Sequence, residues 1–251
     1  MAWLSTTLNG VVSVITDPYA AVFMILGVSY LLLSSVLNVH NLKRNAEGDF
    51  KPVMTYFTSV FGLLFLAPLV VILLTGRATG VTPASLGLGL GNWRLGLLLG
   101  AILLPLLLTS VYLGRKDPVL RDYYPFSKEA MESPGRFVLY EMSYLFMYYL
   151  PWEFTFRGVI LFGLMALLPH TLAGLVIAVM VQTFLSTMFH LGHPDSEVFG
   201  AFLMGLIAGT ATAFVGSIFY VLFHHALAGI LNDVLVYRKL TRGRHLGRET
   251  A

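Results

Sequence analysis

The sequence predicts an all-α membrane protein, a polytopic bundle of about seven transmembrane helices in a single domain, residues 1–251. Hydrophobic residues make up 57% of the chain and charged residues only 12%, whereas a soluble domain carries about 25% charged residues. Apolar segments of about 20 residues, the length that crosses a bilayer, recur between polar turns. The chain has no cysteine, which excludes thiolate metal ligands, a cysteine nucleophile and disulfides.

The first half of the chain is expected to contain three spans and an N-terminal segment at the membrane surface. Residues 1–16 contain no Lys or Arg and so lack the basic region of a signal peptide; we expect an interfacial helix there. The spans are predicted at about 19–39, 53–76 and 93–113. The glycine-rich run at 85–92 lacks the Gly-Lys-Ser/Thr ending of a phosphate-binding loop, so we expect an ordinary loop.

The fourth apolar segment, about 135–168, is too long for one simple crossing. Its 34 residues would extend about 50 Å as a helix, against a hydrocarbon core of about 30 Å. Ser133 and Pro134 predict the N-cap and the first helical position of this segment. Pro151 lies inside it and is expected to kink or break the helix.

Three further spans are predicted at about 171–191, 197–215 and 217–237. Residues 193–195 (His-Pro-Asp) predict a turn followed by a helix start. Glu197 would lie in the first turn of that helix, where a carboxylate suits the positive end of the helix dipole.

The distribution of basic residues predicts the orientation of the bundle. Seven spans place the termini on opposite sides, and 13 of the 16 Lys and Arg residues then fall on one side. Only Arg77 and Arg94 fall on the other side, because Arg157 is inside a span. The positive-inside rule places the N-terminus outside and the basic tail, 238–251, in the cytoplasm. We therefore expect a multi-pass protein of a prokaryotic plasma membrane, whose basic residues report orientation and indicate no nucleic-acid partner.

Ionisable side chains inside the spans indicate a functional site. Glu153 and Arg157 stand four residues apart on one helix face, where they can neutralise each other. Such groups are costly in a bilayer, which makes them candidates for function. The alternative is an ion pair that only holds two helices together. His190 and His225 lie in two other spans and are the further candidates.

Other polar residues of the last span are weaker candidates. His224 and His225 are adjacent and point about 100° apart on a helix, so only one of them can face a site. Asn232, seven residues after His225, shares its helix face. Asp233 and Glu141 are further acids within spans, and each could also lie near a membrane interface.

Three short motifs resemble those of the CAAX protease and bacteriocin-processing family of intramembrane proteases, also called the type II CAAX prenyl endopeptidase or ABI family. That family carries Glu-Glu-x-x-x-Arg, then Phe-x-x-x-His, then His-x-x-x-Asn/Asp. The corresponding stretches of this chain are Trp152-Glu153-Phe154-Thr155-Phe156-Arg157, Ser186-Thr187-Met188-Phe189-His190 and His225-Ala226-Leu227-Ala228-Gly229. The resemblance covers roughly residues 85–235. The chain departs from the family pattern at Trp152, Ser186 and Gly229.

The resemblance implies an intramembrane endopeptidase that hydrolyses a peptide bond in a peptide or membrane-protein substrate within the lipid bilayer. Glu153 and His190 would position and deprotonate a water molecule, as general-base catalysis requires. His225 would donate to the tetrahedral oxyanion, and Arg157 would orient Glu153. An alternative mechanism uses a divalent metal such as zinc, with Glu153, His190 and His225 as its ligands.

Three other functions remain open on the sequence. The first is a catalytically silent family member that acts as a membrane scaffold or immunity factor, which Trp152 and Gly229 favour. The second is a proton-coupled transporter in which Glu153 and the histidines form a proton relay. The third is haem binding by His190 and His225.

Overall fold

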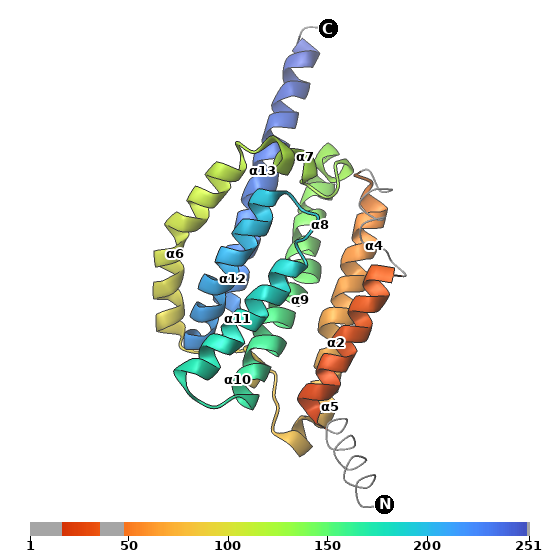
Figure 1. Ribbon diagram of the computed structural model, residues 1–251. Helices are drawn as coiled ribbons and strands as arrows, with labels where there is room; N and C mark the ends of the chain where they lie inside the picture. Colours follow the sequence, from red (N-terminus) through yellow and green to blue (C-terminus); the bar gives the residue numbers. More distant parts are fainter. Residues whose placement is uncertain (1–16, 36–47, 250–251) are drawn as a thin grey trace, which may run out of the picture.

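A computed structural model describes residues 17–35 and 48–249 of the chain. Within these ranges the ordered elements are helices and no strand is present, which confirms the all-α class (Figure 1). The expected interfacial helix at 1–16 lies outside the described residues, as do the end of the predicted first span, 36–39, and the last two residues of the basic tail, 250–251.

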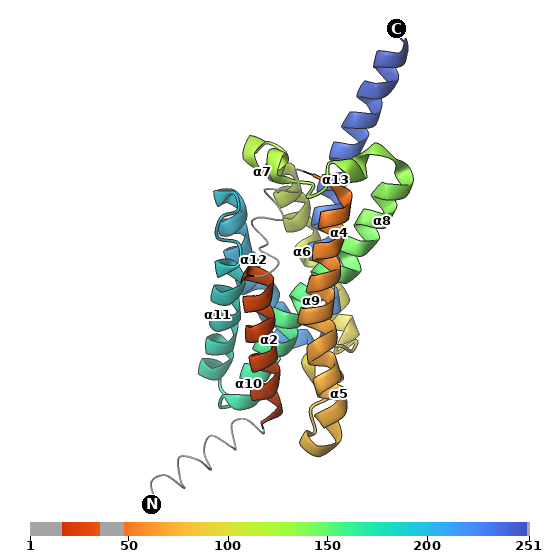
Figure 2. The same cartoon turned by 90° about the vertical axis from the view of Figure 1, so that its right-hand side faces the viewer.

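The N-terminal part of the described chain consists of two apolar helical segments that lie side by side. Helix α2 runs over Pro18–Ser35, and α4 (Phe50–Phe61) continues through a π-helical turn, η1 (Gly62–Leu66), into α5 (Ala67–Thr79). Gly80, in the left-handed region at φ 73°, ends α5. Helix α2 packs against α5 and η1 (Figure 2).

The glycine-rich run forms the expected connection, with one short 3₁₀ turn, η2 (Ala84–Leu86). Helix α6 (Trp93–Gly114) follows, and the Asn92 side chain caps it by accepting a hydrogen bond from the Leu95 amide. Two short helices, α7 (Pro118–Tyr123) and the 3₁₀ helix η3 (Glu129–Glu132), then cover one end of the bundle (Figure 1).

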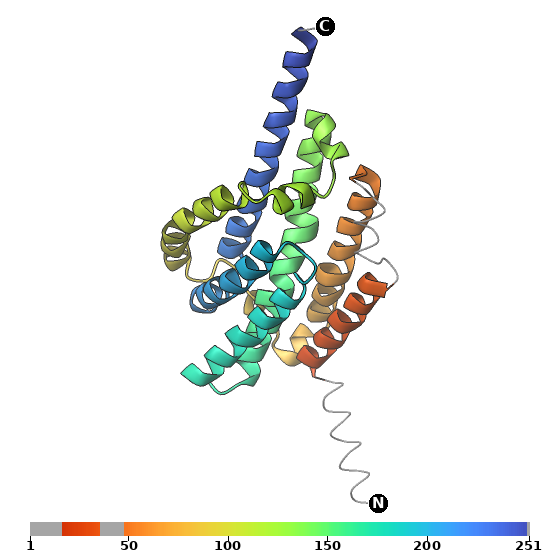
Figure 3. The ribbon, with the colours of Figure 1, turned by 45° about the horizontal axis from the view of Figure 1, so that its top comes forward.

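The long fourth segment is one continuous helical rod through the middle of the bundle (Figure 3). As predicted, the Ser133 hydroxyl caps its start by accepting from the Arg136 amide, at 3.3 Å. The helix does not break at Pro151, because helical structure continues on both sides of it. Two π-helical stretches flank the proline, and both proline and π-helical stretches are typical sites of helix kinks. The rod comprises α8 (Pro134–Tyr144), η4 (Leu145–Tyr149), α9 (Leu150–Glu153), η5 (Phe154–Phe162) and α10 (Gly163–Leu167).

Three helices complete the bundle. Helices α11 (Leu172–Met188) and α12 (Asp195–Val215) pack on each other, and α13 (Phe219–Glu249) packs along α6. Gly216, at φ 73°, makes the turn between α12 and α13. Helix α13 then extends well beyond the end of the bundle (Figures 1 and 2).

Within the part of the chain that the structure describes, five helical segments are long and apolar enough to cross a membrane: Phe50–Thr79, Trp93–Gly114, Pro134–Leu167, Asp195–Val215 and Phe219–Arg238. Helix α11 is also apolar but has only 17 residues, and α2 has 18. Many large apolar side chains are exposed on the outside of the bundle, as expected for a protein that faces lipid. The chain is therefore a membrane-embedded helix bundle, while the count of seven spans stays a prediction.

Candidate functional site

A cavity of about 480 Å³ opens among the middle of the fourth segment, α6, α12 and α13. It brings together all four residues that the sequence singled out, from three different helical regions. The motif departures Trp152, Ser186 and Gly229 also line it, together with Asn232 and Asp233. The predicted site residues on the cavity wall are Glu153, Arg157, His190 and His225.

Glu153 is completely buried at the end of α9, where His225 and Arg157 contact its carboxylate. Its Oε1 accepts a hydrogen bond from Nδ1 of His225 at 2.6 Å. Arg157 lies on the same face, with Nη1 3.4 Å from Oε1 and Nε 3.4 Å from Oε2. A buried carboxylate is tolerated when it is paired in this way. The ion pair and the contact to a cavity-lining histidine therefore coexist.

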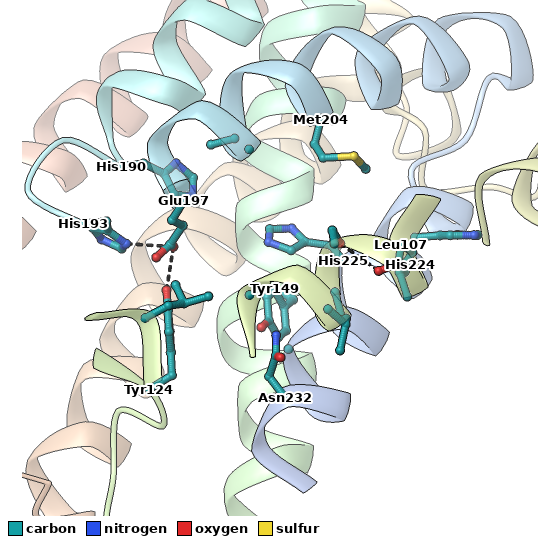
Figure 4. A pocket seen from close by; sticks show the side chains of 18 of the residues that line it. Leu107, Tyr124, Tyr149, His190, His193, Glu197, Met204, His224, His225 and Asn232 are labelled. Atoms are coloured by element: carbon teal, nitrogen blue, oxygen red, sulfur yellow. Dashed lines mark hydrogen bonds and ion pairs between the residues drawn. The ribbon is translucent and has the colours of Figure 1, made fainter. Parts of the chain in front are cut away.

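His225 presents its second nitrogen to the cavity. Because Nδ1 donates to Glu153, Nε2 is the nitrogen that carries a lone pair in the neutral ring. Nε2 makes no hydrogen bond to any part of the chain that the structure describes, and 35% of the side chain is exposed. Figure 4 shows the ring pointing into the cavity between two groups of polar side chains.

His190 lies two residues beyond the end of α11, on the opposite wall of the cavity (Figure 4). Its Nδ1 donates to the backbone carbonyl of Ser186 at 2.8 Å, so the serine side chain is not needed for this contact. The edge of the Trp152 indole packs on the ring, with centroids 5.3 Å apart. Because Nδ1 donates to the Ser186 carbonyl, Nε2 is the nitrogen that carries a lone pair in the neutral ring.

A second carboxylate of the cavity, Glu197, was missed by sequence reasoning, which gave it only a helix-dipole role. Its Oε1 accepts hydrogen bonds from Nδ1 of His193 at 2.8 Å and from the Tyr124 hydroxyl at 2.7 Å (Figure 4). The spacing of His193 and Glu197, four residues apart across a helix start, was a usable signal. Tyr124 lies 73 residues away, and nothing in the sequence predicts its approach.

The two adjacent histidines of α13 diverge, as the sequence predicts. While His225 faces the cavity, His224 turns toward α6, where its Nε2 contacts the Gly100 carbonyl at 2.8 Å. Its Nδ1 contacts the Tyr220 carbonyl at 2.7 Å. Both nitrogens of His224 are thus engaged by backbone oxygens, and the residue ties α13 to α6.

The packing around Gly229 explains why a glycine stands at the end of the third motif. A Cβ on Gly229 would overlap the hydroxyl of Tyr149, whose ring lies against His225 with centroids 4.7 Å apart. The space that a longer side chain at this position would fill is therefore already taken by a tyrosine from the fourth segment.

The two further acids of the spans, Glu141 and Asp233, are both buried inside the bundle. Asp233 lines the cavity and is hydrogen-bonded by Tyr140, while one of its oxygens has no partner. Glu141 lies on α8, away from the cavity wall, and neither of its oxygens has a partner among the described residues.

The divalent-metal alternative, with Glu153, His190 and His225 as ligands, stays a prediction. Among residues 17–35 and 48–249 no group of three or more His, Asp or Glu side chains is placed to hold an ion. Glu153 engages Nδ1 of His225, so Nε2 is the ligand atom that this ring has left.

The fold and its composition define the class of the protein as a membrane-embedded, all-α bundle with a cavity lined by both apolar and polar side chains. Comparison with family models, with curated proteins and with solved structures finds no match for this chain. The resemblance to the CAAX protease and bacteriocin-processing family therefore rests on the sequence motifs, and the family stays a prediction.

Proposed function

We propose that this chain is an intramembrane endopeptidase of the CAAX-protease-like type, which hydrolyses a peptide bond with a histidine-activated water. The observation that carries the proposal is the 2.6 Å contact between Glu153 Oε1 and His225 Nδ1 on the wall of a cavity. A carboxylate–imidazole pair of this kind fixes the ring and stabilises its protonated form, which is the arrangement that general-base catalysis needs.

Glu153 acts through His225 in this mechanism, because it has no exposed surface and cannot touch a substrate. Nε2 of His225 takes a proton from water, and the water oxygen attacks the carbonyl carbon of the peptide bond. The tetrahedral oxyanion then collapses, the C–N bond breaks, and the imidazolium returns its proton to the leaving nitrogen. Glu153 stabilises the imidazolium between these steps, and Arg157 holds Glu153 in place.

His190 and Asn232 have secondary roles in the same proposal. Nε2 of His190, whose Nδ1 is held by the Ser186 carbonyl, accepts the second hydrogen of the water and helps to orient it. Asn232 lies on the same helix as His225 and lines the cavity, so its side-chain amide can donate to the oxyanion. Removing one such donor typically lowers kcat by about 10²–10³.

The second candidate is a catalytically silent member that serves as a membrane scaffold or immunity factor. The observation that favours it is Trp152, whose indole packs on His190 at the position where the resemblance implies a further carboxylate. In that case the carboxylate and its two partners would stabilise the bundle and the cavity would bind without hydrolysing.

The test is hydrolysis by the purified protein in phosphatidylcholine liposomes. A defined set of synthetic membrane peptides serves as substrate, with mass spectrometry to locate the products. We expect Glu153→Gln and His225→Gln each to lower kcat by about 10²–10⁴, and the double variant to lose little more, since the two residues act as a unit. Glu132→Gln, on the exposed end of the bundle, is the matched control. Failure of the wild-type protein to cleave any peptide, or full activity of Glu153→Gln, contradicts the proposal.

We also propose that the cavity serves the cytoplasmic side of a prokaryotic plasma membrane. Asp117, Leu120 and Tyr124, from the α7 region, line it. Helix α7 lies at the end of the bundle where α13 extends outward, and this is the end to which the positive-inside rule assigns the cytoplasm (Figure 1).

A further inference from the structure

The cavity is lined by more negative charge than the rest of the chain would suggest. The whole chain has a formal charge of +3. Among the described residues on the cavity wall, however, Arg157 is the only Lys or Arg, and its charge is engaged by Glu153. Against it stand four acidic side chains: Asp117, Glu153, Glu197 and Asp233. Because Glu153 and Arg157 neutralise each other, Asp117 and Glu197 carry the negative charge of the remaining wall. Negative charge between apolar walls attracts ligand groups of the opposite sign.

Among the described residues, the polar atoms of this cavity that lack a hydrogen-bond partner are mainly acceptors. They include Nε2 of His190 and Nε2 of His225, since each ring is bonded through Nδ1. Asp117 is different, because its oxygens already accept from the Val119 and Leu120 amides and from the Ser196 hydroxyl. A lining of this kind is satisfied by a ligand group that donates several hydrogen bonds.

Glu197 is the acceptor best placed to receive such a group. His193 and Tyr124 both bind Oε1 and fix the carboxylate, but Oε2 is buried and has no hydrogen-bond partner in the described chain. An unpartnered buried carboxylate oxygen is costly, and a donor from a ligand would remove that cost. The nearby walls are apolar and suit the methylene stem of a long cationic side chain; they include Leu107, Val111, Leu120, Phe199 and Met204.

We infer that the cavity binds a primary ammonium group of a peptide, and that Oε2 of Glu197 accepts it. The peptide nature of the ligand rests on the proposed function. A lysine side chain and a free peptide N-terminus share this chemistry. Glu197 thus determines which peptides bind, and it acts independently of the Glu153–His225 pair.

The test measures binding rather than cleavage, so it can fail independently of the proposed function. The full-length protein in phosphatidylcholine liposomes is titrated with fluorescent peptides of one apolar sequence. The first peptide has capped ends and a single lysine, the second has acetyl-lysine in its place, and the third has acetyl-lysine and a free N-terminus. We expect the lysine peptide to bind about tenfold or more tightly than the acetyl-lysine peptide, since a hydrogen bond to a charged group has that value. Recovery of binding by the third peptide identifies the N-terminus as an equivalent source.

Variants in the first turn of α12 test whether the preference for lysine depends on Glu197. Glu197→Gln keeps an acceptor for His193 and Tyr124 but removes the charge, and we expect it to lose the preference for lysine. Glu197→Asp keeps the charge and should retain part of the preference. Asp195→Asn is the matched control, because Asp195 lies in the same first turn but is exposed and outside the cavity wall. Equal binding of the capped lysine and acetyl-lysine peptides overturns the inference, as does a lysine preference that persists in Glu197→Gln with an unchanged melting temperature. Binding with this preference but without cleavage overturns only the proposed function.

Discussion

The imidazole of His225 and the carboxylate of Glu153 are joined by a 2.6 Å hydrogen bond between residues 72 positions apart in the sequence. This contact joins α13 to the middle of the fourth segment. Through it, the buried carboxylate of Glu153 acts on an imidazole that lines the cavity. Arg157 completes the group from the other side. The contacts among these three residues therefore affect both the stability of the bundle and the chemistry of the cavity, and each effect can be measured separately.

Removal of Arg157 should destabilise the protein strongly. Arg157→Met leaves the fully buried Glu153 without its only guanidinium partner, and breaking a buried pair in this way costs about 3–5 kcal/mol. We expect a correspondingly lower midpoint of thermal or denaturant unfolding in detergent micelles. The Glu153→Gln, Arg157→Met double variant should recover part of the loss, because no uncompensated charge remains. Equal stability of Arg157→Met and wild type would mean that the carboxylate does not depend on the arginine.

Gly229 should be intolerant of even one added methyl group. The Cβ of Gly229→Ala would overlap the Tyr149 hydroxyl, and overpacking of this kind costs about 1–3 kcal/mol. Tyr149→Phe removes the hydroxyl, so we expect it to rescue much of the loss in the double variant. Gly135→Ala is the control, since a Cβ there meets nothing within 4 Å. Unfolding midpoints that are the same for Gly229→Ala and Gly135→Ala would contradict the proposed crowding.

Much of the fold was predictable because long apolar segments and their caps are local signals. Ser133, for example, marks the start of the fourth segment in the sequence and caps it in the structure. At Pro151 the sequence predicts a kink or a break, and the structure excludes the break, because α9 and the π-helical stretches η4 and η5 continue the rod on both sides.

The candidate site was predictable in part. The i, i+4 spacing of Glu153 and Arg157 predicted their contact. Helix geometry predicted that the side chains of His224 and His225 point in different directions. The role of Glu197 was out of reach, because it depends on Tyr124, which comes from a loop 73 residues away.

The orientation of the bundle can be tested without background labelling, because the chain contains no cysteine. Arg115 follows the end of α6 near α7, and Arg77 lies in the last turn of α5; both are exposed. If the α7 end faces the cytoplasm, a membrane-impermeant maleimide added to intact bacterial cells that express the protein should label Arg77→Cys and leave Arg115→Cys unlabelled. Both variants should react after the membrane is permeabilised, which controls for accessibility. Labelling of Arg115→Cys in intact cells would invert the orientation and place the α7 side of the cavity outside the cell.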